Sequence, residues 1–140
     1  MIILDTNVLS ALMLRVPEPI VAAWLDRQPE ASIWTTSITL FEIRFGLEAM
    51  PFGRRQAALL EDLNKLLVSI DHRITSFDAD AAHHAGVLMA SRKREGRPRE
   101  LRDTMIAGIV LSRHATLATR NIRDFDDVGA KLVDPWDANS

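Results

Sequence analysis

Met1-Ile2-Ile3-Leu4-Asp5-Thr6-Asn7 opens the chain as an apolar run that ends abruptly at three polar residues. A short apolar run bounded by turn-forming and helix-capping residues is typical of a strand that is buried on both faces. Such strands occur in parallel sheets, whose two faces are covered by helices. The opening segment therefore predicts an α/β fold with Asp5 at the carboxyl end of its first strand.

Strand and helix patterns alternate along the rest of the chain. Further strands are expected at 32–36, 73–77, 116–119 and 131–133, and helices at 6–14, 19–28, 37–50, 54–68, 79–94 and 101–114. This alternation predicts a three-layer α/β/α sandwich around a central, mainly parallel sheet of about five strands. A chain of 140 residues is long enough for one compact domain, so we expect residues 1–140 to form a single domain.

Composition excludes several classes of chemistry. The chain contains no cysteine, which rules out disulfides, zinc–thiolate sites and cysteine nucleophiles. Its formal charge of −2 gives no global indication of nucleic-acid binding, so that function has to be argued from local clusters. The N-terminus lacks the pattern of a signal peptide, and no apolar stretch is long enough to span a bilayer. We therefore expect a cytoplasmic protein that does not contact membranes.

Carboxylates and one amide follow the predicted strands or begin the helices after them. The residues with this placement are Asp5, Glu42, Asp103, Asn121 and Asp124. In a parallel sheet, ligands bind beyond the carboxyl ends of the strands, so these side chains are expected to converge there. Several carboxylates in one cleft repel unless a cation lies among them. A hard divalent ion with oxygen ligands, Mg²⁺ or Mn²⁺, meets that requirement.

Four segments resemble, in the same order, the four motifs of PIN-domain nucleases. They are Ile3–Ser10, Thr36–Gly46, Asp103–Gly108 and Thr119–Phe125. Asp-Thr-Asn alone would be a weak indication, whereas four motifs in order over nearly the whole chain are specific. The chain length and the residues of the four motifs most resemble the toxin ribonucleases of the VapC and FitB type.

This resemblance implies a PIN-like fold and a metal-dependent endoribonuclease. Asp5, Glu42 and Asp103 would hold Mg²⁺ or Mn²⁺, and a metal-activated water would hydrolyse the phosphodiester. Either Asn121 or Asp124 would complete the site. The resemblance further implies a homodimer and a cognate antitoxin protein, with operator DNA bound only through that antitoxin.

Two departures from the family pattern stand out. The third motif usually has a small or apolar residue before its Asp and ends in Ala-Ala, whereas this chain has Arg102 and Ala107-Gly108. The fourth motif can carry an Asp where this chain has Asn121, which offers a carbonyl oxygen but no charge. Asp124 therefore becomes the expected charged member of that corner.

Each acid also has a purely structural interpretation. Asp5 could cap the following helix, and Glu42 could close a capping box that begins at Thr39. Asp103 could be an ion-paired acid in a first helical turn, and the Asn121-x-x-Asp124 spacing also suits a capped turn.

Basic residues precede the third motif in a run from Arg92 to Arg102. We expect this run to border the acids and to contact RNA phosphates, with ordinary solvation as the alternative. Thr6 could donate its hydroxyl to Asp5 or to a metal-bound water. The predicted substrate-binding residues are Thr6, Arg97, Arg99, Arg102 and Arg120.

Two alternative functions remain at this point. A catalytically inactive binding module with the same fold would fail to respond to divalent metal. A haloacid-dehalogenase-like phosphatase also begins with an Asp after its first strand, but it needs a second Asp two residues later, where this chain has Asn7.

Overall fold

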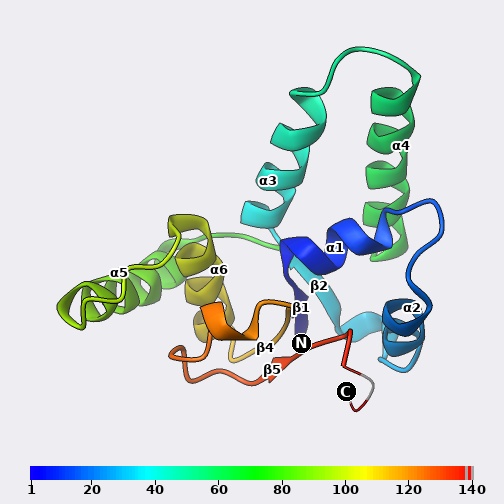
Figure 1. The fold of residues 1–140 in the computed structure, drawn as a ribbon. Helices are drawn as coiled ribbons and strands as arrows, with labels where there is room; N and C mark the ends of the chain where they lie inside the picture. The colour runs from blue at the N-terminus through cyan, green and yellow to red at the C-terminus, as the bar shows by residue number, and fades with distance from the viewer. Residues whose placement is uncertain (138, 140) are drawn as a thin grey trace.

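A computed structural model describes residues 1–137 and 139 of the chain (Figure 1). Five strands form one sheet in the order β3-β2-β1-β4-β5, and every pairing is parallel. The strands are β1 (Ile2–Leu4), β2 (Ile33–Thr36), β3 (Ile74–Thr75), β4 (Thr116–Ala118) and β5 (Leu132–Val133). The predicted five-stranded parallel sheet is therefore confirmed, with strands shorter than the sequence patterns indicated.

Six α-helices connect the strands. They are α1 (Thr6–Leu12), α2 (Pro19–Asp26), α3 (Ser37–Glu48), α4 (Arg54–Ser69), α5 (Ala79–Arg94) and α6 (Leu101–Ser112), with short 3₁₀ turns η1 (Glu30–Ser32) and η2 (Ile122–Asp124). Asp78 caps α5, because its carboxylate accepts a hydrogen bond from the Ala81 N–H. Helix α6 ends two residues earlier than predicted, since His114 adopts a left-handed conformation with φ of 51°.

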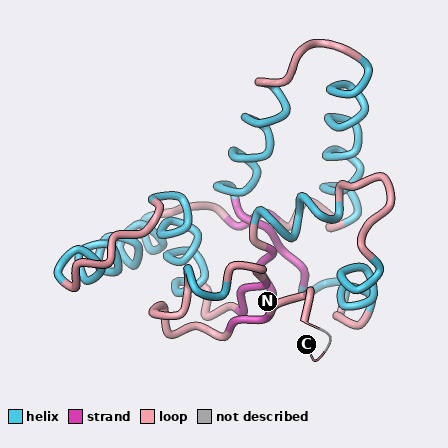
Figure 2. The backbone as a smooth tube through the Cα atoms, in the orientation of Figure 1, coloured by secondary structure: helices cyan, strands magenta, loops and turns pink. Residues whose placement is uncertain are grey.

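Successive strand side chains point to opposite faces of the sheet and so build two cores. Ile3 and Leu117 pack into a cluster beneath α5 and α6, whereas Leu4 and Ala118 pack into a cluster with residues of α1, α2, α3 and α4. The strands accordingly lie at the centre of the molecule, between the α5–α6 pair and the other four helices (Figure 2). This is the three-layer arrangement that the alternating pattern predicted. None of the described helices combines the length and apolar composition needed to cross a membrane.

Strand β1 lies between β2 and β4, so the direction in which successive strands are added to the sheet changes beside β1. The chain first builds outward through β2 and β3, and then returns through α5 and α6 to place β4 on the other side of β1. In open parallel sheets, this reversal opens a crevice at the carboxyl ends of the two strands. Asp5 follows β1 and Thr119 follows β4, so both stand at that crevice.

Helices α5 and α6 approach each other most closely at Gly108. A Cβ added there would lie 2.4 Å from the Ala81 carbonyl oxygen and 2.7 Å from the Ala85 Cβ. Both neighbours on α5 are buried alanines, so neither has a flexible side chain that could move aside. The departure from Ala-Ala in the third motif thus has a packing cause, and it determines how α6 sits against α5.

We expect Gly108→Ala to destabilise the fold by about 1–3 kcal/mol, the usual cost of overpacking. Gly86→Ala in α5 is the matched control, because a Cβ there meets nothing within 4 Å. Removing a mid-helix glycine without a clash should stabilise by about 0.5–1 kcal/mol. Urea denaturation measures both changes. If Gly108→Ala were as stable as Gly86→Ala, the close contact between α5 and α6 would not constrain position 108.

Candidate functional site

Asp5 is the most enclosed acid at the crevice, with 3% of its surface exposed. Its Oδ1 accepts the Thr6 backbone N–H at 2.8 Å, while Oδ2 accepts the Thr119 hydroxyl at 2.8 Å and the Asn7 amide at 3.2 Å. Burial raises the pKa of Asp5, and these hydrogen bonds oppose the rise only in part. Asp5 is also the N-cap of α1, so its capping role is compatible with a place in the candidate site.

Glu42 lies in the second turn of α3, and the capping-box interpretation is wrong. Thr36 is the N-cap of this helix, and its hydroxyl accepts the Thr39 N–H at 3.0 Å. Glu42 Oε1 instead accepts the Thr6 hydroxyl at 3.1 Å. The suggestion that this hydroxyl serves Asp5 is likewise wrong, because Thr6 reaches Asp5 through its backbone N–H.

Three threonine hydroxyls form a hydrogen-bonded chain that ends on Glu42. Thr36 Oγ1 donates to Thr39 Oγ1 at 3.2 Å, and Thr39 Oγ1 and Thr6 Oγ1 are 3.1 Å apart. A hydroxyl carries one proton, so the donation from Thr6 to Glu42 requires Thr39 to donate to Thr6. Thr36 and Thr39 are fully buried, which fixes the chain and with it Glu42 Oε1.

Asp103 faces the other acids from the first turn of α6. Burial and the negative charges of Asp5, Glu100, Asp124 and Glu42 raise its pKa to about 7. The ion-paired interpretation is wrong for Asp103 in the described part of the chain. The adjacent Arg102 pairs instead with Glu100 at 3.0 Å and lies 4.0 Å from Glu42 Oε2.

The η2 turn supplies the last corner of the site. Asn121 precedes the turn but makes no side-chain capping bond within the described residues, and its backbone N–H donates to Thr119 Oγ1 at 3.0 Å. Asp124 lies near enough to raise the pKa of Asp5 and of Asp103. It is therefore Asp124 that adds charge to the cluster.

Thr119 and Asn7 contact the candidate site, although the sequence analysis gave neither of them a role in it. Thr119 Oγ1 joins Asp5 to Asn121. Asn7 donates to Asp5 through its amide and accepts the Arg120 N–H at 3.2 Å through its carbonyl. Both residues tie the end of β1 to the end of β4. Their places inside the first and fourth motifs were the available signal.

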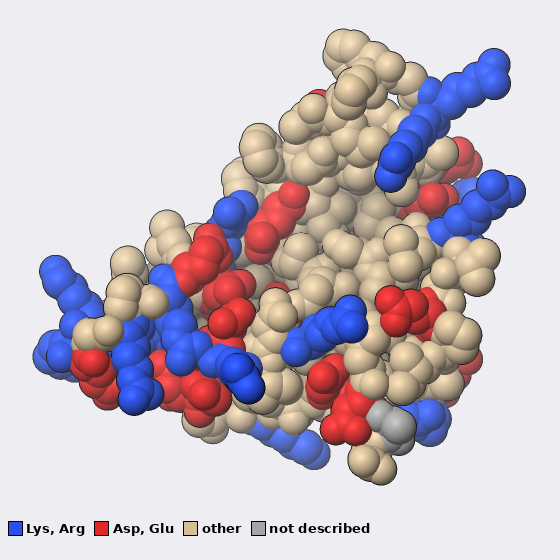
Figure 3. Space-filling view, in the orientation of Figure 1, with Lys and Arg blue, Asp and Glu red and all other residues tan. Residues whose placement is uncertain are grey.

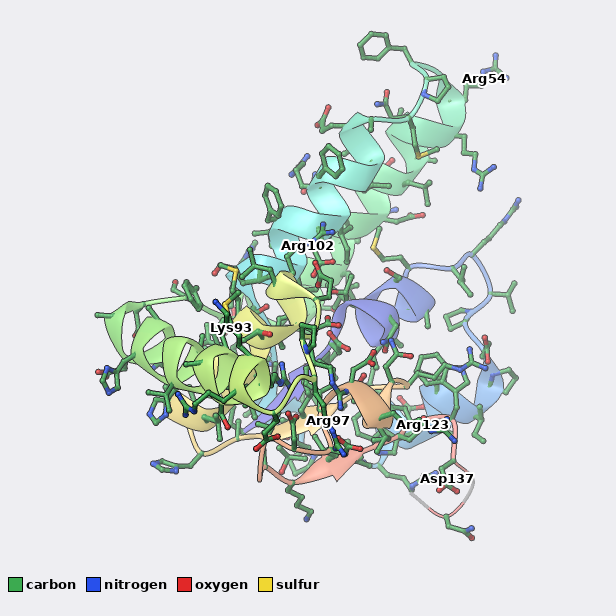
Figure 4. The ribbon with its side chains drawn as sticks, turned by 60° about the vertical axis from the view of Figure 1, so that its left-hand side comes forward. Arg54, Lys93, Arg97, Arg102, Arg123 and Asp137 are labelled. Carbon is green, nitrogen blue, oxygen red and sulfur yellow. The ribbon has the colours of Figure 1, made fainter. Side chains whose placement is uncertain are left out.

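The basic residues divide into different environments. Arg92 is 2% exposed, so the expectation that it belongs to a phosphate-binding run is wrong. Arg99 donates to the Arg123 carbonyl and pairs with Asp126 at 3.3 Å, which favours a role in holding η2 over the predicted phosphate contact. Figure 4 shows Arg102 at the end of α6 that meets α3, and Arg97 in the connection from α5 to α6.

Arg97 and Arg120 differ in how their side chains are engaged. The Arg97 side chain is exposed and forms no hydrogen bond or ion pair with the described residues. Arg120 lies over the Trp136 ring at 4.7 Å, which directs an exposed guanidinium along the surface beside η2. Of the predicted substrate contacts, Arg97 is therefore the most available to a phosphate.

A mostly apolar groove of about 870 Å³ adjoins the acids between α1, α3 and α4. Thr6, Glu42 and Arg102 line its polar end, and Leu14, Leu47 and Leu59 are among its apolar walls. The space-filling view shows charged side chains gathered over the base of α3 and the nearby end of α6 (Figure 3). A ligand in this groove would thus lie directly beside Glu42.

The donor chemistry of the site fits a hard divalent cation. Asp5, Glu42, Asp103 and Asp124 provide only oxygen atoms, and at least three of them raise the pKa of another member through their charge. In the described part of the chain, no three acidic or histidine side chains are already close enough to hold an ion as they stand. A cation would therefore have to draw the carboxylates closer, and it would relieve the repulsion that raises the pKa of Asp103.

Comparison with known sequences covers almost the whole chain. A PIN domain model matches residues 2–131. The plasmid stability protein StbB of Pseudomonas syringae pv. tomato is 37% identical over 139 residues, which are 99% of this chain and 100% of the relative. The VapC ribonuclease Y4jK of Sinorhizobium fredii is 36% identical over 138 residues, which are 98% of this chain and 99% of the relative.

Comparison with solved structures agrees with the sequence matches. The structure of FitAB bound to an IR36 DNA fragment has a TM-score of 0.88 and 29% identity, over 98% of this chain and 96% of the other.

We expect Asp103→Asn to stabilise the metal-free protein at high pH. The pKa of Asp103 is raised to about 7 in the folded chain, so its contribution to stability is present below about pH 4 and is lost as the pH rises through about 7. An amide carries no charge, so the melting temperature of Asp103→Asn should exceed that of the wild type by a few degrees at about pH 8, and much less at about pH 4.5.

Thermal unfolding in a chelating buffer across this pH range measures the effect. Asp80→Asn is the matched control, because Asp80 is an exposed acid in the first turn of α5 and lies outside the cluster. An equal gain for both variants, or none for Asp103→Asn, would contradict the proposed repulsion.

Proposed function

The chain belongs to the PIN-domain family, and from this we propose that it is a metal-dependent endoribonuclease, the toxin of a toxin–antitoxin pair. The observation that carries the proposal is the clustering of Asp5, Glu42, Asp103 and Asp124 at the topological switch point, where their charges act on one another. The phosphatase alternative fails, because Asn7 uses its amide to hold Asp5 and cannot serve as a second acid.

Asp5, Asp103 and Glu42 are the proposed holders of Mg²⁺ or Mn²⁺, with Asp124 as a further acid. When bound, such an ion holds a phosphate oxygen, lowers the pKa of a coordinated water and stabilises the charge of in-line displacement. Asp5 is already oriented by three hydrogen-bond donors, so it would form the fixed side of the site. No described residue donates a hydrogen bond to the Asp103 carboxylate, so Asp103 would be the side of the site that adjusts.

Glu42 is suited to orient the attacking water and to receive its proton. Thr6 holds Oε1, which leaves Oε2 directed toward the groove and Arg102. Partial burial raises the pKa of Glu42, which makes its carboxylate a better proton acceptor near neutral pH. The products would be a 5′-phosphate and a 3′-hydroxyl, without a covalent enzyme intermediate.

The RNA backbone is proposed to lie across the acids, between basic residues of neighbouring elements. Arg97 in the α5–α6 connection and Arg120 just before η2 provide exposed guanidinium groups, and Arg102 lines the groove. Phosphate contacts of this kind give affinity without reading the base sequence.

The groove is the proposed docking site for an apolar segment of the cognate antitoxin. Its walls are mostly apolar and its polar end includes Glu42 and Arg102, so an occupant would cover the catalytic acids. The related FitAB was solved bound to DNA. By that likeness, we propose that operator DNA is reached through the antitoxin.

A second copy of the chain is the proposed occupant of the exposed apolar face of α3. Phe41 and Phe45 are 59% and 61% exposed, and their rings stack at 6.4 Å. Large apolar side chains grouped in this way are usually covered by a protein partner.

We expect Mn²⁺ to stabilise the wild-type protein and to be required for RNA cleavage. At a concentration of about 100 times its dissociation constant, the ion should add about 2.7 kcal/mol of stability. Asp103→Asn should fold, gain nothing from Mn²⁺ and lose cleavage by orders of magnitude. It is a cleaner test than Asp5→Asn, which would turn an acceptor into a donor facing Thr119 and Asn7.

Thermal shift with Mn²⁺ and gel-based RNA cleavage measure the two effects, and Asp80→Asn is again the control. A wild-type protein that gains no stability from Mn²⁺ and cuts no RNA would favour the inactive binding module. A wild-type protein that cleaves RNA in chelator would refute the metal dependence.

We expect Arg97→Gln to weaken RNA binding through the loss of one phosphate contact. The slope of log affinity against log salt should fall by about 0.7 for single-stranded RNA. Turnover at saturating RNA should stay the same, because the contact holds substrate and transition state alike. Binding measured in chelator across a salt series, beside single-turnover rates in Mn²⁺, separates the two.

Arg99→Gln and Lys65→Gln are the comparisons. Arg99 is engaged with η2, and Lys65 is paired with Glu61 on α4, so neither change should alter the salt slope. A wild-type slope for Arg97→Gln would place the phosphate contact elsewhere.

A further inference from the structure

We propose that Arg92 is a positioning residue, which holds the start of α6 and the η2 turn in one arrangement so that Asp103 and Asp124 face the same point. The inference rests on the proposed function of these acids. It concerns a residue that lies outside the four motifs and contacts none of the reacting groups.

The Arg92 guanidinium is bound on every side within the core. It is 2% exposed, although arginine is among the residues least often buried. Nε and Nη2 donate to the two oxygens of Asp127 at 2.8 and 2.7 Å, which is a bidentate pair. The carboxylate of Asp127, in the segment that follows η2, thus compensates the buried positive charge of Arg92.

The remaining donors of Arg92 reach the two elements that carry the acids. Nη1 donates to Thr104 Oγ1 at 2.9 Å, and Thr104 is the residue next to Asp103 on α6. Nη2 also donates to the backbone carbonyl of Asp124 at 3.2 Å. One side chain on α5 therefore fixes the residue beside one acid and the backbone of another.

The hydrogen bonds of Arg92 oppose an electrostatic repulsion within the site. Asp124 is among the charges that raise the pKa of Asp103, so the two carboxylates repel. Without a fixed scaffold, the two segments that carry them could relax apart. Arg92 opposes that relaxation from behind the site, and its place in the core keeps it from neutralising either carboxylate directly.

A guanidinium is the group that this position requires. It presents a planar fork to Asp127 and still has donors for Thr104 and the Asp124 carbonyl. A lysine ammonium keeps the charge but cannot match this geometry. Arg92→Lys therefore removes the tie while keeping a cation beside Asp127.

Arg113 provides a matched control on the same pair of helices. It follows α6, where its Nε donates to Thr75 Oγ1 at 3.2 Å and its Nη2 pairs with Asp78 at 2.6 Å. It thus joins a threonine and an aspartate, as Arg92 does, but at the opposite end of α6 from Asp103. Arg113→Lys should affect the fold without affecting the acids.

The experiment compares Arg92→Lys and Arg113→Lys by thermal unfolding, by Mn²⁺ binding in calorimetry and by the kcat and KM of RNA cleavage. For Arg92→Lys we expect Mn²⁺ affinity and kcat each to fall by about 10–100-fold, as with other residues that orient metal ligands, and KM to stay near the wild-type value. For Arg113→Lys we expect a lower melting temperature with wild-type Mn²⁺ affinity and kcat.

Thr104→Val keeps the proposal testable if Arg92→Lys does not fold. It removes the hydroxyl that links Arg92 to α6 while leaving the pair with Asp127 in place. We expect Thr104→Val to weaken Mn²⁺ binding and Thr104→Ser to restore it. Wild-type Mn²⁺ affinity and kcat in folded Arg92→Lys, or in Thr104→Val, would overturn the role of Arg92.

The wild-type measurements separate this inference from the proposed function. Binding of Mn²⁺ and cleavage of RNA by the wild type support the proposed function whatever the variants do. A wild-type protein that neither binds Mn²⁺ nor cleaves RNA would overturn the proposed function, and the positioning role with it.

Discussion

The burial of the Asp5 carboxylate at the carboxyl end of β1 is the constraint on which the rest of the site depends. A buried carboxylate is costly unless donors surround it, and here the donors come from the start of α1 and from the residue after β4. Satisfying Asp5 therefore joins β1 and β4 at the switch point of the sheet. The same hydrogen bonds fix the direction of its carboxylate, so stability and orientation have one cause.

The fold holds further carboxylates near this fixed acid. Glu42 is held through Thr6 by a chain of buried hydroxyls, and Asp103 is carried on a helix that packs tightly against α5 through Gly108. Arg102 offsets part of the charge near Glu42, but Asp103 keeps a pKa of about 7. Repulsion therefore remains among these carboxylates in the folded chain, as expected for the proposed cation site.

The arginines that precede the third motif show how one sequence cluster divides into separate roles. Arg92 is drawn into the core by Asp127, Arg99 turns toward η2, and Arg97 remains exposed. Their spacing along the chain contains no hint of this division. Arg92 lies on the buried face of α5, whereas Arg97 and Arg99 lie in the connection after that helix, so their side chains meet different elements.

The sequence by itself determined the order of strands and helices, the parallel sheet and the acids at its carboxyl ends, because apolar periodicity and helix-capping residues act locally. It also contained the four motifs in order, which identify the family. Only the tertiary structure decided that Thr36 rather than Thr39 caps α3, that Thr119 and Asn7 hold Asp5, and that Arg92 is buried. These outcomes depend on contacts between residues far apart in the chain. Several donors lie near each acceptor in the sequence, and only the fold decides which of them lies within hydrogen-bond distance.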